Sequence, residues 1–220
     1  MAANSFGPCG GVLRIERSPV ETLILARHAE SDCSARGIVN GDPGSGNCPL
    51  TERGDEEARA LGRLLAGREI DLYLTSEFAR TQQTARIALA GRELSWLELA
   101  ELNDIRVGAF EGGALDLYTT WAHENAPEER PPGGGESRAE AAARFVHGFR
   151  IVLARPERTI LVVTHGLAVS YLREAIAGNE PRARHAPVPY ARPFEYSADE
   201  LARALDLFDV WLRAPRWSET

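Results

Sequence analysis

The chain is organised around one run of apolar residues that ends in charged side chains, Leu23-Ile24-Leu25-Ala26-Arg27-His28-Ala29-Glu30. A short apolar run of this kind is typical of a strand in a parallel sheet that is covered on both faces. A buried arginine is costly unless an anion or a carboxylate pairs with it. We therefore expect Arg27 and His28 to lie where a strand ends and a ligand site begins. The alternative is a core histidine beside a salt-bridged arginine.

A second stretch ends in the same way, Thr159-Ile160-Leu161-Val162-Val163-Thr164-His165-Gly166. It is again an apolar strand followed by a histidine. Ligands of open α/β sheets bind outside the carboxyl ends of the strands. Two histidines at two such ends therefore indicate one shared pocket that contains His28 and His165.

Strands alternate with helical segments along the chain, which implies a parallel sheet with helices on both faces. Strands are expected at residues 21–27, 70–75, 94–99 and 159–164, and helices at 51–67, 76–89, 115–125, 136–156 and 166–177. Thr51 and Ser76 are expected to cap the first two of these helices. Residues 31–49 and 179–196 are expected to be irregular.

The ends of the chain differ from its middle. Residues 1–20 are expected to form a flexible leader, and residues 21–220 a single catalytic domain. The capping box Ser197-Ala198-Asp199-Glu200 predicts a last, divergent helix at about 197–213. The role of residues 178–220 does not follow from the sequence.

The composition is that of an ordinary soluble globular protein, with 44% hydrophobic and 26% charged residues. The net charge of −7 argues against nucleic acid or an anionic membrane as a partner. No apolar stretch approaches the roughly 18 residues that a membrane span needs, and residues 1–11 carry no signal-peptide segment. Cys9, Cys33 and Cys48 are odd in number and lack C-x-x-C spacing. We therefore expect no disulfide framework and a cytoplasmic location.

Further polar residues follow the other predicted strands. Arg80 falls in the first turn of a helix, where its planar fork suits phosphate oxygens, although a solvated helix arginine is the alternative. Asp104 and Glu111 place carboxylates in a loop that contains glycine. Phosphoryl transfer needs a nucleophile, cationic clamps and an acid for the leaving oxygen, and these residue types supply them without a metal or cofactor. A metal hydrolase is less favoured because its four candidate ligands match no common spacing, namely His28, Asp32, Asp104 and His165.

Seven motifs occur along the chain in a fixed order, namely Arg27-His28-Ala29-Glu30, Leu50-Thr51-Glu52-Arg53-Gly54, Ser76 to Ala85, Leu102-Asn103-Asp104, Gly112, Pro132-Gly133-Gly134-Gly135-Glu136-Ser137 and Val163-Thr164-His165-Gly166. In this order they resemble the histidine phosphatase superfamily, with a spacing nearest to the broad-specificity phosphatases. The resemblance covers about residues 21–178. It implies a phosphoglycerate mutase-like fold, a three-layer α/β/α sandwich with a mostly parallel central sheet.

The resemblance also implies roles for the residues at the strand ends. His28 would be the nucleophile and would carry a phosphohistidine. Arg27, Arg80 and His165 would bind the phosphoryl oxygens. The family pattern implies neither a metal nor a cofactor.

Asp104 stands at the position of the family's proton donor, where close relatives usually carry glutamate. Glu101 and Glu111 are rivals, because a shift of a few residues in the loop would bring either one inward. The implied substrate contacts are Ser34, Asn40, Gly41 and Gly166. Ser34 departs from the pattern, because the mutases carry asparagine at this position.

Two departures favour hydrolysis over phosphoglycerate mutase-type transfer. Family mutases hold the substrate carboxylate with paired arginines, whereas residues 105–130 contain only Arg106 and Arg130. Leu167 also replaces the asparagine that follows the second His-Gly of the mutases. We therefore expect a phosphomonoester hydrolase that acts on small phosphorylated metabolites. A mutase and a non-catalytic phosphate-pocket protein are the alternatives.

The stretch at residues 105–130 is instead rich in large apolar side chains, namely Phe110, Leu115, Leu117, Tyr118 and Trp121. They predict either a lid over an apolar leaving group or a packed helix. His123, His147 and His185 receive no role. Neither the physiological substrate nor the oligomeric state follows from the sequence.

Overall fold

Four of the five strands in the central sheet run parallel to one another. The computed structural model describes residues 20–218. The strands are β1 (Thr22–Arg27), β2 (Leu72–Thr75), β3 (Ser95–Glu98), β4 (Thr159–Thr164) and β5 (Pro193–Ser197), in the order β3-β2-β4-β1-β5. Only β5 is antiparallel to its neighbour. The expected leader lies outside the described residues except for Val20, which is buried.

The register of the sheet brings the two histidine motifs to one edge. Arg27 of β1 pairs with Thr164 of β4. The residues that follow are therefore neighbours, and the backbone nitrogen of His28 donates to the carbonyl oxygen of Thr164 at 2.9 Å. The shared edge expected from the two apolar runs is thus present.

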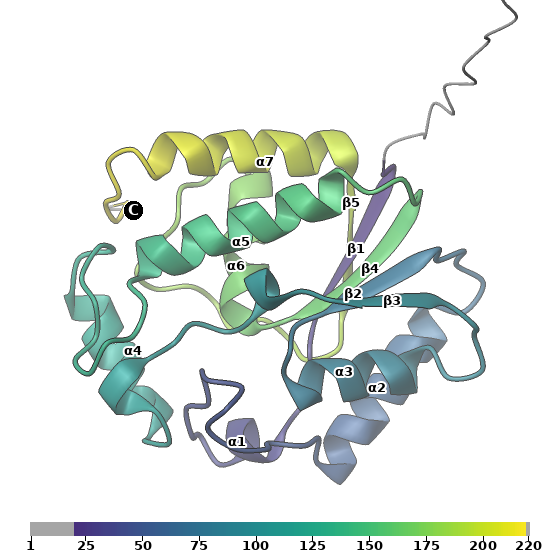
Figure 1. Cartoon of the computed structure of the whole chain (residues 1–220), viewed down its shortest axis with the longest axis horizontal. Helices are drawn as coiled ribbons and strands as arrows, with labels where there is room; N and C mark the ends of the chain where they lie inside the picture. The colour runs from purple at the N-terminus through teal and green to yellow at the C-terminus, as the bar shows by residue number, and fades with distance from the viewer. Residues whose placement is uncertain (1–19, 219–220) are drawn as a thin grey trace, which may run out of the picture.

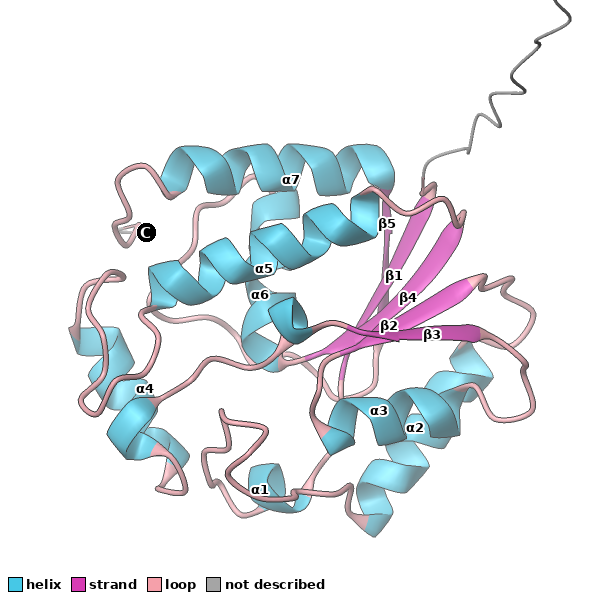
Figure 2. Cartoon of the chain, in the orientation of Figure 1, coloured by secondary structure: helices cyan, strands magenta, loops and turns pink. Residues whose placement is uncertain are grey.

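Helices cover both faces of the sheet (Figures 1 and 2). On one face lie α2 (Glu52–Leu64) and α3 (Ala79–Ala88), and on the other lie α5 (Arg138–Leu153), α6 (Gly166–Ile176) and α7 (Ala198–Trp211). The alternation of side chains along β1 accounts for the two layers. Leu23 and Leu25 belong to the core beneath α5–α7, whereas Ile24 and Ala26 belong to the core beneath α2 and α3. The expected three-layer, mostly parallel architecture is confirmed.

Two further helices lie at the end of the sheet to which β1 and β4 point (Figure 1). They are α1 (Asp32–Ala35) and α4 (Leu115–Glu124), with 3₁₀ turns at Ala100–Leu102 and Gly108–Phe110. The expectation that residues 31–49 are entirely irregular is wrong, because Ser31 and Ser34 form a capping box that starts α1. A four-residue helix is too short to show a period in the sequence.

The expectation of no disulfide is also wrong. Cys33 and Cys48 form a disulfide, with their Cα atoms 5.6 Å apart. The loop between them turns back on itself, since Ser31 forms a β-bridge with Leu50. Cysteine spacing along the sequence gives no sign of such a return.

Two predicted helix caps have different outcomes. Thr51 caps α2 by accepting from the backbone nitrogen of Gly54 at 3.0 Å, as expected. Ser76 does not cap α3, which begins at Ala79 after Phe78. Its hydroxyl is instead directed to the edge of the sheet, where it meets His165.

The C-terminal segment returns to the sheet. Residues 193–196 were expected to be irregular, but they belong to β5, which pairs antiparallel with β1. Pro193 has no N–H, so the start of an edge strand suits it. The capping box at Ser197 is present and starts α7. This return also brings Ala191 onto the end of β1, where its nitrogen donates to the carbonyl oxygen of Arg27 at 3.0 Å.

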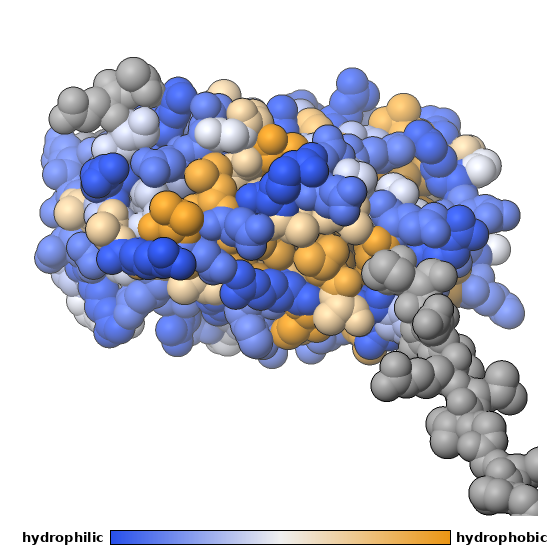
Figure 3. Space-filling view, turned by 90° about the horizontal axis from the view of Figure 1, so that it is seen from above, coloured by the Kyte–Doolittle hydropathy of each residue, from blue (hydrophilic) through white to orange (hydrophobic). Residues whose placement is uncertain are grey.

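The face that carries α7 shows apolar side chains interrupted by polar ones (Figure 3). Val210 of α7 is 57% exposed. Among the described residues, no helix is both long enough and apolar enough to cross a membrane.

Candidate active site

A cavity of about 410 Å³ lies at the edge of the sheet where the two histidine motifs end. Its volume is within the usual range of small-molecule sites, roughly 300–1,000 Å³. It is lined by eight of the nine residues that the sequence singled out, namely Arg27, His28, Ser34, Asn40, Gly41, Arg80, Asp104 and Gly166. The ninth, His165, lies behind the wall and is fully buried.

His28 follows β1 directly and is 3% exposed. Its Nδ1 lies 2.7 Å from the carbonyl oxygen of Ala29. A carbonyl oxygen only accepts, so Nδ1 carries the proton and Nε2 carries the lone pair. Burial, followed by the nearby Arg80 and Arg27, holds the pKa of His28 well below 6.5. The ring is therefore neutral at pH 7, as a nucleophile requires.

His165 packs edge-on against His28, with the ring centroids 5.3 Å apart. Its Nε2 lies 2.8 Å from the hydroxyl of Ser76, and its Nδ1 lies 3.2 Å from Nη2 of Arg80. Because Arg80 only donates, Nδ1 accepts and the Nε2 proton is directed to Ser76. Burial, then Arg80, lowers the pKa of His165 well below 6.5. Sequence reasoning missed this role of Ser76, since a serine after a strand is typical of a helix cap.

Arg80 lies in the first turn of α3 and is 4% exposed. Its Nη1 donates to Oδ1 of Asn40 at 2.6 Å, and its Nη2 donates to the carbonyl oxygen of Asn40 at 2.9 Å. Its Cζ also lies 4.1 Å from the centre of the Phe78 ring. The expected solvated alternative is therefore excluded for Arg80, and Asn40 fixes the orientation of its guanidinium.

The loop that contains Asn40 and Gly41 is held by Glu111. The backbone nitrogen of Gly41 donates to Oε2 of Glu111 at 2.9 Å, and the hydroxyl of Ser45 donates to its Oε1 at 2.5 Å. A Cβ on Gly41 would collide with the carbonyl oxygen of Ile105, so only glycine fits there. Glu111 thus accepts hydrogen bonds from this loop, and it does not line the cavity.

Asp104 is the one member of the three candidate acids that lines the cavity. Its Oδ2 lies 3.4 Å from both Nη2 of Arg80 and Nδ1 of His165. Burial raises the pKa of Asp104 above 3.8, although Arg80 opposes this shift. Glu101 instead faces His147, with 3.8 Å between Oε1 and Nε2.

Arg27 contacts residues that sequence reasoning did not consider. Its Nη1 donates to the carbonyl oxygen of Val188 at 2.9 Å, and its Cζ lies 3.9 Å from the centre of the Tyr190 ring. Its Nε is buried and has no hydrogen-bond partner among the described residues. The segment around Val188 is rich in proline and lacks any period, so no sequence signal placed it here.

An ion pair between Arg144 and Glu136, which was not expected from the sequence, supports the loop that contains Asp104. Arg144 forms a two-pronged contact with Glu136, from Nε to Oε1 and from Nη2 to Oε2, each at 2.8 Å. The same guanidinium donates to the carbonyl oxygens of Asn103 at 2.8 Å and Asp104 at 3.0 Å. Glu136 belonged to a recognised motif, but its partner eight residues later did not.

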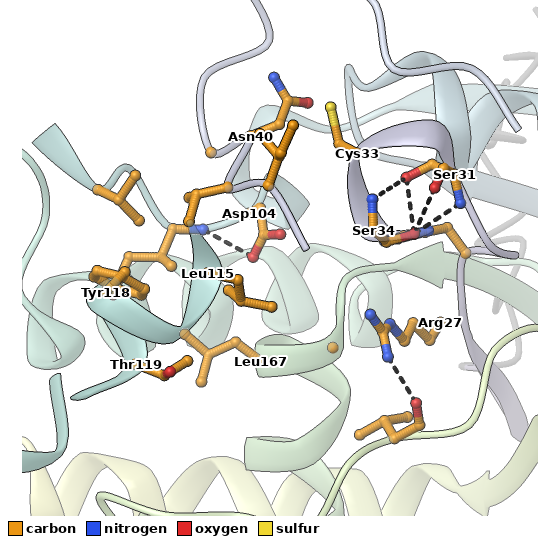
Figure 4. A pocket seen from close by; sticks show the side chains of 18 of the residues that line it. Arg27, Ser31, Cys33, Ser34, Asn40, Asp104, Leu115, Tyr118, Thr119 and Leu167 are labelled. Carbon is orange, nitrogen blue, oxygen red and sulfur yellow. Dashed lines mark hydrogen bonds between the residues drawn. The ribbon is translucent and has the colours of Figure 1, made fainter. Parts of the chain in front are cut away.

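The two sides of the cavity carry different side chains (Figure 4). Arg27 and Ser34 lie on one side, where Ser34 exchanges hydrogen bonds with Ser31 in the cap of α1. Leu115, Tyr118 and Leu167 lie on the opposite side, and Asp104 lies between the two groups.

The aromatic stretch forms a packed helix that also borders the cavity. Tyr118 packs against Phe110 and Trp121, with ring centroids 5.7 Å and 6.2 Å away. Tyr118 and Leu115 also line the cavity. His123 and His185 line the same cavity, although sequence reasoning gave them no role.

Two helix N-termini also reach this edge of the sheet. Neither α3 nor α6 has a side-chain hydrogen bond at its N-cap. The first turns of such helices offer backbone N–H groups to an anion. Residues 20–218 contain no group of three or more His, Cys, Asp or Glu side chains that could hold a metal ion.

The fold and the cavity define an α/β protein with a neutral histidine and two arginines in the wall of a cavity of small-molecule size. The family model described as the histidine phosphatase superfamily (branch 1) matches residues 23–197. A 2,3-bisphosphoglycerate-dependent phosphoglycerate mutase from Brucella melitensis biotype 2 is 32% identical over 179 residues, which cover 73% of this chain and 83% of the mutase.

Solved structures agree with this match. The α-ribazole phosphatase from Shigella flexneri is similar with a TM-score of 0.68 at 29% identity, covering 79% of this chain and 89% of that one. Bacillus stearothermophilus YhfR is similar with a TM-score of 0.69 at 27% identity, covering 79% and 89%. The chain belongs to the histidine phosphatase superfamily. The predictions of this family, of its fold and of an enzyme are confirmed.

Proposed function

We propose that the protein hydrolyses small phosphomonoesters through a phosphohistidine at His28. One observation carries the proposal. The Nδ1 proton of His28 is directed to the carbonyl oxygen of Ala29, which leaves the Nε2 lone pair beside Arg27 and Arg80. A buried neutral imidazole flanked by two cations is suited to attack a phosphoryl group.

The reaction takes place in two steps. In the first, Nε2 of His28 forms a bond to phosphorus, the bond to the ester oxygen breaks, and the carboxyl group of Asp104 gives its proton to that oxygen. In the second, water attacks the phosphorus, the P–N bond breaks, and the Asp104 carboxylate takes the proton. The products are an alcohol and inorganic phosphate. A raised pKa supports this role of Asp104.

Arg27 and Arg80 are proposed to stabilise the charge on the phosphoryl oxygens, and His165, which was expected to bind these oxygens, is proposed to act through Arg80 from behind the cavity wall. The buried Nε of Arg27 supports this role, because it has no hydrogen-bond partner within residues 20–218. Arg80 is held in place by Asn40, and His165 lies against both Arg80 and His28. Gly41, Gly166 and Ser34 contribute to the wall around the phosphate.

The mutase alternative rests on the 32% identical relative. Two observations favour hydrolysis. Arg106 pairs with Glu136 at 3.7 Å and Arg130 pairs with Glu140, and neither arginine lines the cavity. We therefore expect phosphate release to exceed transfer between the carbons of phosphoglycerate, even with a bisphosphoglycerate primer. A larger rate of transfer than of hydrolysis would favour the mutase.

Rapid quench with a ³²P-labelled substrate tests the covalent step. We expect acid-labile label on His28, and no label on a His28→Ala protein. The exposed His147 offers a matched control, since His147→Ala should label normally. Turnover without label at His28 would overturn the proposal, and binding without turnover would indicate a phosphate-pocket protein. Turnover should also persist in excess chelator.

A cytoplasmic location is proposed as well, and the two paired cysteines give it a test. Disulfides persist in oxidising compartments and are rare in the cytosol. A cytoplasmic protein should therefore carry Cys33 and Cys48 as thiols when cells are quenched with an alkylating agent before lysis. Recovery of the disulfide under these conditions would argue for another compartment.

A further inference from the structure

One wall of the cavity carries polar side chains that the proposed mechanism does not use. They come from α4, from the first turn of α5 and from the segment before β5, namely Tyr118, Thr119, His123, Arg138 and His185. We call these five residues the distal wall. Figure 4 shows Tyr118 and Thr119 on the side of the cavity opposite to Arg27.

Arg138 is the charged member of the distal wall and is only 5% exposed. Its Nε donates to the hydroxyl of Tyr171 at 2.8 Å, and its Cζ lies 5.2 Å and 5.5 Å from the ring centres of Tyr171 and Trp217. Its Nη2 is buried and has no hydrogen-bond partner among residues 20–218. A guanidinium carries five donors, so these contacts leave it incompletely paired.

The hydroxyl of Tyr118 is a second buried group that has no hydrogen-bond partner within the described part of the chain. Burial raises the pKa of Tyr118, so the hydroxyl keeps its proton and acts as a donor. Buried polar groups are nearly always paired, so two unpaired donors in one wall indicate a missing acceptor.

His123 of the distal wall lies near two arginines. Burial lowers the pKa of His123, and the nearby Arg184 and Arg138 lower it further. A negatively charged ligand group would be attracted by Arg138 and Arg184, although the protein as a whole carries a net charge of −7.

We propose that the distal wall binds a second anionic group of the substrate, with Arg138 and Tyr118 as its donors. The substrate is then a phosphomonoester whose leaving group has an apolar middle and ends in a carboxylate or a second phosphate. The apolar middle would face Leu115 and Leu167, which line the cavity with these residues. This inference rests on the proposed function, because it assigns the other end of the same substrate.

Alkyl phosphates of equal length test the proposal when they end in a methyl group, a carboxylate or a second phosphate. The loss of one hydrogen bond to a charged group changes a binding constant or kcat/KM by roughly tenfold or more. We therefore expect kcat/KM for at least one anion-ended substrate to exceed that of the methyl-ended one by roughly tenfold or more. The anion-ended substrate with the higher kcat/KM identifies the preferred group as a carboxylate or a phosphate. Equal kcat/KM values for all three would overturn the proposal.

Variants of the wall assign this preference to its donors. Arg138→Gln should remove the preference, and Tyr118→Phe should reduce it. Tyr171→Phe is the matched control, because it removes the partner of Nε but keeps the cation, and it should retain the preference. Thermal melts of each variant check that the fold is kept. An Arg138→Gln protein that melts normally and keeps the full preference would contradict the assignment.

Calorimetry with non-hydrolysable phosphonates separates this inference from the proposed function. A carboxylate-ended phosphonate should bind the wild-type protein roughly tenfold or more tightly than a methyl-ended one, and Arg138→Gln should lose the difference. If the difference is present but His28 takes no label, the subsite stands and the phosphatase mechanism fails. If His28 is labelled but neither kcat/KM nor binding distinguishes the chain ends, the mechanism stands and the subsite is wrong.

Discussion

Single side chains of the site depend on which atom carries a proton. Nδ1 of His28 is protonated against Ala29, and Nδ1 of His165 accepts from Arg80. Burial keeps both rings neutral and raises the pKa of Asp104. The same buried pocket thus contains a neutral His28, which can act as the nucleophile, and an Asp104 whose pKa is higher than the usual value for aspartate.

Asp104→Asn should affect substrates according to the basicity of their leaving group. An alkoxide leaves poorly without a proton, whereas the phenolate of p-nitrophenyl phosphate needs little protonation. We expect kcat for alkyl phosphates to fall by roughly a hundredfold or more, with a much smaller loss for the aryl phosphate. Glu101→Gln is the control and should affect neither. Equal losses for both substrates would make Asp104 a positioning residue instead.

Arg80→Lys should lower kcat by about a hundredfold or more, the usual cost of losing one stabilising donor. The reason is geometric, because Nη1 and Nη2 both bond to Asn40 and a lysine has a single nitrogen. Arg86 lies on the same helix and faces solvent, so Arg86→Lys should be unaffected. Steady-state kinetics of both variants with one substrate provide the comparison. A fully active Arg80→Lys protein would contradict the proposed clamp.

At the scale of elements, the strand ends position the site and the C-terminal segment completes it. β1 and β4 deliver His28 and His165, and the return into β5 lays Val188 and Tyr190 against Arg27. Residues 178–220 had no assigned role from sequence alone. The contacts of Val188 and Tyr190 with Arg27 indicate that this segment positions the arginine.

Tyr190→Ala should weaken phosphate binding by roughly twofold to thirtyfold, because a cation–π contact is worth about 0.5–2 kcal/mol. The ring stacks on the guanidinium of Arg27 at 3.9 Å, so its loss frees that side chain to move. Tyr190→Phe keeps the ring and should stay close to wild type. Inhibition constants for inorganic phosphate measure the effect. If the phenylalanine variant is as weak as the alanine variant, the hydroxyl rather than the ring is responsible.

Some of these elements could be predicted from the sequence and others could not. The apolar runs before His28 and His165 predict the ends of β1 and β4, because a buried strand must end where its side chains become polar. Ser76 looked like a cap, because its contact with His165 is not local in the sequence. The segment at Val188 has no period, and its place depends on an edge strand that begins with Pro193. The Cys33–Cys48 pair depends on the path of a loop.

At the scale of the whole molecule, we propose that residues 21–220 form a single domain. β5 pairs with β1, and α7 packs against α5 and α6, so the C-terminal segment shares the core of the sheet. One cooperative transition is therefore expected when the protein unfolds. Separate transitions for the C-terminal segment and the remainder would contradict a single domain.

Stability should decrease as the pH falls below about 6.5. The pKa values of His28 and His165 are lowered in the folded protein, so the unfolded chain binds more protons below its usual histidine pKa of about 6.5. The contribution of these two histidines to stability is fully present above that pH, and it is lost as the pH falls toward their lowered pKa values in the folded protein. Asp104 acts in the opposite direction nearer its own pKa. Thermal midpoints across pH 4–8 measure the balance.

A variant that lacks one of the two buried histidines tests this cause. His28→Gln removes one buried titrating group and should make the dependence shallower. Parallel curves for wild type and His28→Gln would show that the buried rings do not control acid sensitivity.

The disulfide between Cys33 and Cys48 has a consequence for the unfolded chain as well as for the folded one. It closes a ring over a sequence separation of 15 residues, and the ring contains Asn40 and Gly41. A closed ring of this size has fewer conformations, which is worth about 3 kcal/mol of stability in the chain-entropy description. When the disulfide is formed, the loop that contains Asn40 and Gly41 is confined before the sheet has formed, and ordering it around Arg80 costs less entropy than ordering an open loop of the same length; a cytoplasmic protein with free thiols would lack this contribution.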